Sequence, residues 1–226
     1  MFLEFKQSNN QDGFHNDESI KYFSDLAFNS NEDILLDIII NALQINNFEN
    51  RKSCLFEIKD YYFNKGVVFN SNEFDENLEN FLNMNIGNVK GAFLELLMYK
   101  LINVYCRYDK LYKECYVIKN NIINNHPYDI IVINNVVNFI DIKFSCRRLK
   151  KIHLDYLTEY VEENNVKSYL VSLDTMFGIN NKLQFIKVEE DLSEEDFHEI
   201  LNNIALISIN EIYDLILNKK CLVNAY

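Results

Sequence analysis

The most restrictive feature of this chain is a pair of charges inside an apolar strand pattern. Residues 139–144 read Phe-Ile-Asp-Ile-Lys-Phe, and β-branched and aromatic residues of this kind are typical of a strand packed within a sheet. Side chains alternate along a strand with period two, so Asp141 and Lys143 lie on the same face. A charge that is buried without a partner or a metal costs several kcal/mol. The pattern therefore predicts a sheet that carries a polar site on one of its strands.

The first part of the chain has helical periodicity. Apolar residues recur at spacings of three and four over residues 32–44, which is the period of an amphipathic helix. The same pattern predicts further helices over residues 51–64, 75–83 and 87–105. Residues 1–30 are polar, rich in asparagine and weakly patterned, with a short helix around Ile20 and Phe23. We therefore expect an N-terminal region that is all helical.

The second part alternates between strand and helix patterns. Apolar, β-branched runs predict strands over residues 115–118, 129–133, 137–144 and 168–173, with a helix over 149–163 between the last two. Beyond them we predict a strand at 183–188, a helix at 193–203, a strand at 205–209 and a helix at 211–217. This order predicts an α/β protein with a mixed central sheet flanked by helices.

The turn between two of these strands decides whether two carboxylates meet. A strict two-residue turn at Asn134 and Asn135 would place Asp129 opposite Ile140, and Asp141 would then point to the other face. An odd-numbered loop or a bulge shifts the pairing by one residue and flips the faces. We predict that shift, which places Asp129 opposite Asp141. The alternate residues of the strand would then face the core: Ile140, Ile142 and Phe144.

The charge of the chain is unevenly distributed. The formal net charge is -12, which by itself disfavours a nucleic-acid partner. Residues 100–151, however, contain ten basic and four acidic side chains, a local balance of +6 that leaves -18 for the remainder. A basic island in an acidic protein is typical of a phosphate-binding face. The alternative interpretation is a set of ordinary solvated lysines.

The cysteines and the apolar runs indicate in which cellular compartment the protein is expected. The five cysteines include no CxxC pair, and no histidine is spaced for a zinc site, which argues against a structural metal or a disulfide framework. No N-terminal segment has the pattern of a signal peptide, and the longest apolar runs fall far short of the ~18 residues of a membrane span. We therefore expect a reduced, cytoplasmic protein that does not insert into membranes.

Two acids and a lysine on neighbouring strands suit metal-assisted phosphodiester hydrolysis. Mg2+ prefers oxygen ligands and is usually held by one or two carboxylates, which Asp129 and Asp141 could supply with the backbone carbonyl of Ile142. Lys143 would hold the attacking water or the scissile phosphate. Glu95, from the middle of the helix at 87–105, would ligate a second metal or orient a water.

Each of these residues also has a plain structural interpretation. In that interpretation Glu95 is an ordinary solvated glutamate on a helix, as most such residues are. Asp129 would cap a turn, and Asp141 would form an edge-strand salt bridge with Lys143.

These residues resemble a known motif. Pro127-Tyr128-Asp129 at a strand start, Asp141-Ile142-Lys143 on the next strand and the helix glutamate Glu95 look like the PD-(D/E)XK nuclease superfamily. The resemblance covers residues 87–173 and implies a restriction-endonuclease-like fold whose core runs α, three strands, α, strand. It also implies cleavage of DNA, or less often RNA, that depends on Mg2+ or Mn2+. The chain departs from the written motif by the inserted Tyr128 and by an aspartate as the second acid.

The resemblance implies a division of the chain and a partner. Residues 86–226 would be the nuclease-like domain, and the helical region 1–85 would serve recognition, dimerisation or regulation. We expect a DNA endonuclease that acts as a homodimer on duplex substrates; restriction, branched-DNA resolution, transposition and phage defence all fit. Two alternatives remain: a nuclease-fold subunit that binds or assembles without cleaving, and an acidic α/β interaction protein with no nucleic-acid role.

Several polar residues near the motif are candidates for binding the nucleic acid. Ser145, Arg147 and Arg148 follow the lysine and could contact backbone phosphates, as could Lys119 on the first strand. His126 precedes the proline and could lie near the metal, although a histidine beside a turn is more often structural.

Overall fold

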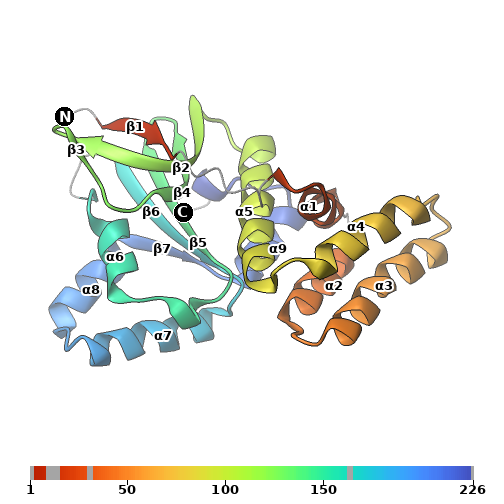
Figure 1. Cartoon of the computed structure of the whole chain (residues 1–226). Coiled ribbons are helices and arrows are strands. Elements are labelled where there is room, and N and C mark those ends of the chain that lie inside the picture. The colour runs from red at the N-terminus through yellow and green to blue at the C-terminus, as the bar shows by residue number, and fades with distance from the viewer. Residues whose placement is uncertain (1–2, 9–15, 30–32, 162–164, 225–226) are drawn as a thin grey trace. The chain divides into compact units, whose positions relative to one another are not determined.

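The computed structural model describes residues 3–8, 16–29, 33–161 and 165–224. Contacts divide the chain into two compact units, one of Asp12–Lys100 and one that joins Met1–Gln11 with Leu101–Tyr226 (Figure 1). The division that we expected after residue 85, and the functions assigned to its two sides, stay predictions.

The helical unit is built from amphipathic helices that bury their apolar stripes. They are α1 (Glu18–Asn29), α2 (Asp33–Gln44), α3 (Phe48–Asn64), α4 (Ser71–Asn83) and most of α5 (Ile86–Tyr105). Asn47 and Asn70 cap α3 and α4 by accepting hydrogen bonds from backbone N–H groups of the first turn. Inside, the ring of Phe23 lies 4.4 Å from that of Phe81 and 5.9 Å from that of Phe74, centroid to centroid.

The predicted helices of this unit are confirmed. The pattern at 51–64, 75–83 and 87–105 corresponds to α3, α4 and α5, and that at 32–44 to α2, apart from Glu32, which lies outside the described residues. The short helix around Ile20 and Phe23 is α1. Within the described part of the chain, no helix combines the length and the apolar character that crossing a membrane requires.

The other unit contains a mixed sheet. Its strands are β1 (Glu4–Gln7), β2 (Lys110–Lys119), β3 (Ile122–Ile123), β4 (Tyr128–Ile133), β5 (Val137–Lys143), β6 (Val166–Ser172) and β7 (Ile204–Ile207). They are ordered β1-β2-β4-β5-β6-β7, with β3 beside β2. The pairs from β1 to β5 are antiparallel, and β5, β6 and β7 run parallel. The prediction of an α/β protein with a mixed central sheet is confirmed. Apart from the short β3, the succession α5, β2, β4, β5, α6, β6 has the predicted order of a helix, three strands, a helix and a strand.

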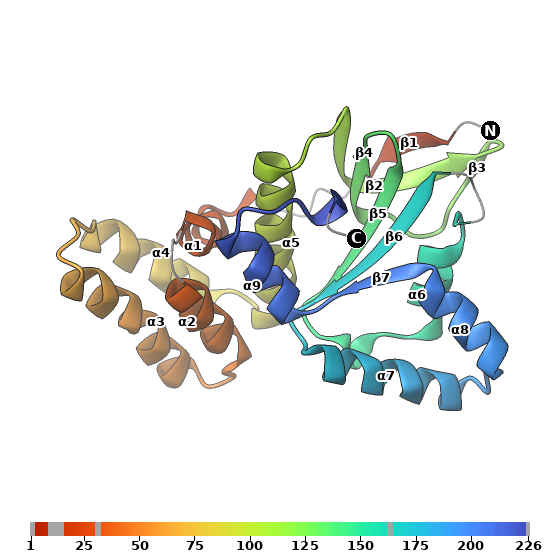
Figure 2. The same cartoon turned by 180° about the vertical axis from the view of Figure 1, so that it is seen from behind.

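Helices cover this sheet on one face. They are α6 (Lys151–Thr158), α7 (Met176–Glu189) and α8 (Glu194–Asn202), while α9 (Ile209–Leu217) follows β7 (Figures 1 and 2). Phe139 and Leu170 of the sheet are fully buried in one cluster with Leu154, Leu183 and Phe197 of the three helices. On the opposite face Tyr169 is buried, and its hydroxyl lies 3.4 Å from the carbonyl oxygen of Val223 in the C-terminal turn.

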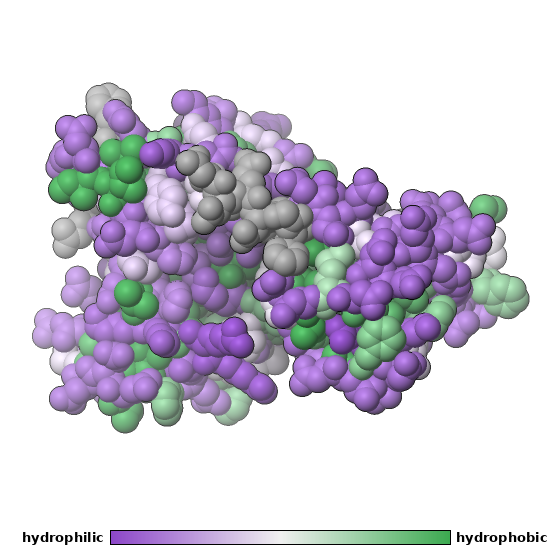
Figure 3. Space-filling model, viewed as in Figure 1, coloured by the Kyte–Doolittle hydropathy of each residue, from purple (hydrophilic) through white to green (hydrophobic). Residues whose placement is uncertain are grey.

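The prediction of a strand at 183–188 is wrong, because these residues belong to α7. Ile179, Leu183 and Ile186 are buried at helical spacing, and Thr175 caps the helix by accepting a hydrogen bond from the N–H of Gly178. The helix also carries apolar side chains on its outer side, namely Phe177, Phe185 and Val188, and hydrophobic patches interrupt the polar surface over it in Figure 3. Because α7 carries apolar residues on both its inner and its outer side, a short run of its sequence does not show the helical period.

Other boundaries differ from the predictions. The helix expected over 149–163 is α6, which spans only Lys151–Thr158 after a 3-10 helix at Cys146–Arg148; Glu162 and Glu163 lie outside the described residues. The strand expected at 115–118 is the much longer β2. The expectation that the N-terminal region is all helical is wrong, because β1 is a strand that pairs with β2. Four residues at the edge of a sheet carry too little pattern to predict.

The predicted register between β4 and β5 is confirmed. Ile133 pairs with Val137 and Ile130 with Ile140, so the loop between the strands is odd-numbered and the same register places Asp129 opposite Asp141. The side chain of Asn134 stabilises this loop by accepting a hydrogen bond from the N–H of Val136 at 2.9 Å.

The expectation that the cysteines are all reduced is wrong. Cys106 and Cys221 form a disulfide, with Cα atoms 4.7 Å apart and 115 residues between them in sequence. It joins the segment after α5 to the C-terminal turn. A pairing over this separation leaves no spacing motif, so the sequence alone could not reveal it. Cys54, Cys115 and Cys146 are free thiols.

Candidate active site

Asp141 and Lys143 of β5 form the centre of the candidate site. Lys143 Nζ lies 2.7 Å from Asp141 Oδ1, which confirms that the two side chains share a face. The prediction that Ile140 and Ile142 face a core is confirmed by their burial, whereas Phe144 is only half-buried. The face of Asp141 is also partly apolar, since Phe139 is buried in the cluster under α6 to α8. Asp141 itself is only 5% exposed, whereas Lys143 is half-buried.

One oxygen of Asp141 is left without a partner. Oδ2 is buried and, among the residues that the structure describes, accepts no hydrogen bond. A buried, unsatisfied carboxylate oxygen is costly, and native structures rarely retain one without a reason such as an ion, a water or a catalytic role. This orphaned oxygen therefore marks a place where a cation or a donor from a ligand would be stabilised.

Asp129 lies beside this pair through the strand register. Its Oδ2 accepts a hydrogen bond of 2.6 Å from the backbone N–H of Ile142, the residue between Asp141 and Lys143. Residues directly opposite on antiparallel strands have Cβ atoms roughly 4.5–5.5 Å apart, so the carboxylates of Asp129 and Asp141 are neighbours. The fold thus brings together three of the four predicted catalytic residues.

Glu95 is the fourth. It lies in the middle of α5, half-buried, and belongs to the helical unit. Its convergence with the carboxylates of the sheet stays a prediction.

The surroundings of Asp141 include residues that sequence reasoning did not assign to the site. A cavity of about 10 Å3 beside it is lined by His126, Tyr128, His153, Tyr156 and Leu157. This volume accommodates about one water molecule. His126 had been considered for its place before Pro127, but nothing in the sequence pointed to His153 or Tyr156, because the packing of α6 onto the sheet brings them there.

The two histidines of this cavity are held by specific contacts. The ring of His126 stacks on that of Tyr156 at 5.0 Å between centroids. Nδ1 of His153 accepts a hydrogen bond of 3.0 Å from the N–H of Lys150. Burial lowers the pKa of His153, and the positive charge of Lys143 lowers it further. The lowered pKa favours the neutral imidazole, which adds no positive charge beside Asp141.

The predicted nucleic-acid-binding residues lie after the lysine and on β2. Ser145 donates to the carboxylate of Asp174 at 3.1 Å and caps the 3-10 helix that contains Arg147 and Arg148. Both arginines are exposed. Lys119 Nζ lies 5.7 Å from the ring centroid of Tyr160. The role of these residues in binding nucleic acid stays a prediction.

The donor set fits a hard cation with few protein ligands. Within the described ranges, no three or more His, Cys, Asp or Glu side chains are grouped so as to hold a metal ion. Mg2+ does not require such a group, because it keeps several waters and is usually bound by one or two carboxylates. Asp129 and Asp141 supply that number, and the orphaned Oδ2 of Asp141 is an oxygen donor of the right kind.

Comparisons with known proteins find similarity only at the level of structure. No family model matches the chain, and no curated protein sequence matches it. A solved structure described as a restriction endonuclease PspGI–substrate DNA complex aligns with 96% of this chain and 99% of that chain, at 13% sequence identity and a TM-score of 0.36. A TM-score of this size is too low to support an argument, so the description of the fold depends on the element order and the register given above.

Proposed function

We propose that this chain is a metal-dependent nuclease that hydrolyses phosphodiester bonds, with DNA as its substrate. The observation that carries the proposal is the buried, unsatisfied Oδ2 of Asp141, whose other oxygen pairs with Lys143, beside Asp129 on the neighbouring strand. A salt bridge that served stability alone would leave no buried oxygen unsatisfied, since that costs about 1–3 kcal/mol.

Asp129 and Asp141 would hold Mg2+ or Mn2+, together with the backbone carbonyl of Ile142 and, in our proposal, Glu95. When bound, the metal supplies positive charge to the phosphate and lowers the pKa of a water. The N–H of Ile142 orients the carboxylate of Asp129. Lys143 holds the attacking water or the scissile phosphate. When substrate binds, the ammonium group of Lys143 leaves Asp141 and contacts one of these groups instead.

The helix α6 restricts access to Asp141. The cavity beside this carboxylate holds about one water and is closed on one side by His153, Tyr156 and Leu157 of α6. We therefore propose that α6 shifts when metal and substrate bind. Hydrogen exchange of the α6 amides is expected to accelerate when Mn2+ and DNA are added together, while exchange in β6 stays unchanged. Equal protection of α6 in both states would contradict a shift.

The proposed DNA contacts have a measurable salt dependence. Each lysine or arginine that neutralises a phosphate contributes about 0.9 to the slope of log K against log salt concentration on duplex DNA. Arg147→Gln and Arg148→Gln are each expected to reduce that slope by about one. The control is Lys220→Gln, an exposed lysine that pairs with Asp214 at 2.8 Å. Equal slopes in all variants would mean that the 3-10 helix is not part of the DNA-binding surface.

A panel of substrates tests the proposed activity. Single-stranded, duplex and branched DNA, and RNA for comparison, are incubated with Mg2+ or Mn2+, and cleavage is followed on gels. A native mass measurement with and without DNA tests the proposed homodimer. Absence of cleavage on every substrate would exclude the proposed activity under these conditions.

We propose a cytoplasmic location for the protein. Disulfides such as Cys106–Cys221 are more common in oxidising compartments.

A second candidate function has its own supporting observation. The carboxylate of Asp141 is covered by α6 and already pairs with Lys143, an arrangement that suits a nuclease-fold protein that binds nucleic acid or assembles with a partner without cleaving. Binding to DNA at low salt with no cleavage in either metal would favour this function.

A further inference from the structure

A second and much larger cavity lies at the other end of the strands that carry the acids. Its volume is about 560 Å3, which is within the range of small-molecule sites. The residues that line it are Arg107, Tyr108, Asp109, Asn134, Asn135, Val136, Asn138, Lys167 and Val223. Asn134 to Val136 form the loop between β4 and β5, so the cavity opens where β5 begins, whereas Asp141 lies near its end.

Asn138 is a lining residue that hydrogen bonds hold in place. Asn138 is 1% exposed, and its side-chain amide donates hydrogen bonds of 3.1 Å to the carbonyls of Val132 and Val136. The hydroxyl of Tyr169 lies 3.4 Å from Asn138 Oδ1 and 3.4 Å from the carbonyl of Val223. A buried lining residue whose hydrogen bonds are satisfied is typical of a preformed binding site.

The disulfide holds two walls of the cavity in place. Arg107 directly follows Cys106, and Val223 comes two residues after Cys221. The covalent bond therefore joins the segment after α5 to the C-terminal turn at the point where both segments line the cavity. This arrangement limits the conformational entropy that a ligand would have to remove on binding.

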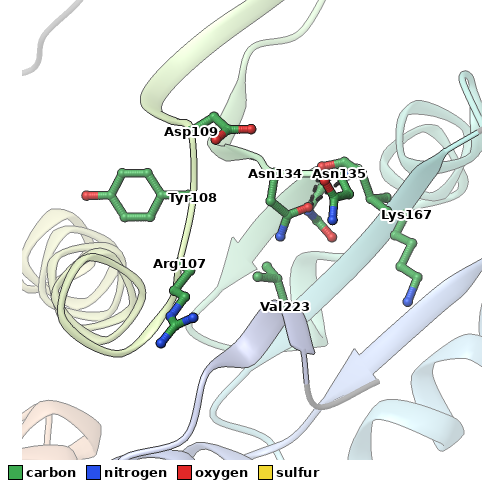
Figure 4. A pocket seen from close by; sticks show the side chains of 9 residues that line it. Arg107, Tyr108, Asp109, Asn134, Asn135, Lys167 and Val223 are labelled. Carbon is green, nitrogen blue, oxygen red and sulfur yellow. Dashed lines mark hydrogen bonds between the residues drawn. The ribbon is translucent and has the colours of Figure 1, made fainter.

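The charges and amides of the lining define the chemistry of a ligand. Figure 4 shows Arg107 and Lys167 on opposite sides, with Asn134, Asn135 and Val223 between them, while Tyr108 points away. Two cations stand against one carboxylate, that of Asp109. Arginine matches phosphate oxygens with two parallel hydrogen bonds, and asparagine amides offer both donors and acceptors.

We propose that this cavity binds a free nucleotide, with its phosphates held by Arg107, its base or sugar against the amides of Asn134 and Asn135, and Lys167 at the opposite side of the ligand. The size of the cavity, the two cations and the amides between them fit a ligand that carries both phosphate and a hydrogen-bonding base. The site is separate from Asp129, Asp141 and Lys143, so the inference does not depend on the proposed nuclease activity.

Binding of fluorescent nucleoside mono- and triphosphates to the full chain with its disulfide tests the proposal. Saturable binding is expected, with competition by unlabelled nucleotide that is stronger than competition by pyrophosphate. Arg107→Gln and Lys167→Gln are each expected to weaken binding by about tenfold or more, since each removes a charge-assisted hydrogen bond. Both side chains are exposed, so the variants are expected to fold, and the two test the site independently.

Lys151→Gln is the matched control, because Lys151 pairs with Asp155 at 2.8 Å on α6 and does not line the cavity. It is expected to bind nucleotide as the wild type does. Absence of saturable binding by any nucleotide would overturn the proposal. So would binding that Arg107→Gln and Lys167→Gln leave unchanged, or a preference for DNA strands with no affinity for free nucleotides. Cleavage is measured in parallel, and its presence or absence leaves this test unaffected.

Discussion

Asp141→Asn is expected to abolish cleavage and at the same time to leave the metal-free protein as stable as the wild type, or more stable by about 1–2 kcal/mol. The loss of activity, roughly 10³-fold or more, follows from removing a charged ligand of the proposed metal, which would stabilise the charge that develops on the phosphate. The gain in stability follows from Oδ2, which is buried and unsatisfied among the described residues. A neutral amide removes the cost of a buried charge at that atom.

The opposite result is expected if the ion pair with Lys143 stabilises the fold by more than the unsatisfied Oδ2 costs. Breaking a buried ion pair by removing one partner costs about 3–5 kcal/mol, so Asp141→Asn would then lower the free energy of unfolding. Lys143→Ala is expected to lose activity to a similar degree as Asp141→Asn while keeping the fold. Urea unfolding and cleavage rates are measured on the same preparations. Asp155→Asn is the control, because it breaks an exposed ion pair, with Lys151, that is worth at most about 1 kcal/mol.

The site could be predicted from the sequence wherever local periodicity determines it. Alternation along β5 places Asp141 and Lys143 on one face, and the loop at Asn134 determines which residue lies opposite Asp129. Both features depend on a few neighbouring residues, so no knowledge of tertiary structure was needed. The large helices were predictable for the same reason, since their buried residues recur at the helical period over several turns.

The remainder depends on contacts between distant segments. His153 and Tyr156 reach the surroundings of Asp141 only because α6 packs on the sheet. The cavity near Arg107 and Lys167 is assembled from several separate segments of the chain, none of which carries a motif. α7 was mistaken for a strand because its outer side is apolar as well, so the run at 183–188 shows no helical alternation.

Loss of the Cys106–Cys221 disulfide is expected to destabilise the sheet unit by about 3–5 kcal/mol. In the chain-entropy model the effect grows with the length of the closed loop, and a loop of this size approaches about 5 kcal/mol. The sequence separation here is 115 residues. The double variant Cys106→Ser, Cys221→Ser, and the wild type treated with a dithiol, are expected to unfold at the same, lower urea concentration.

The effect of this disulfide is distinguishable from that of other cysteines. Cys54→Ser changes a free, half-buried thiol of the helical unit, so it is expected to leave the transition of the sheet unit where it is. Because two units can unfold in separate transitions, a single midpoint is not a sufficient readout, and unfolding is followed by hydrogen exchange in β5 and in α3. A dithiol that leaves the stability of β5 unchanged would mean that packing of Tyr169 against the C-terminal turn holds that segment without the covalent bond.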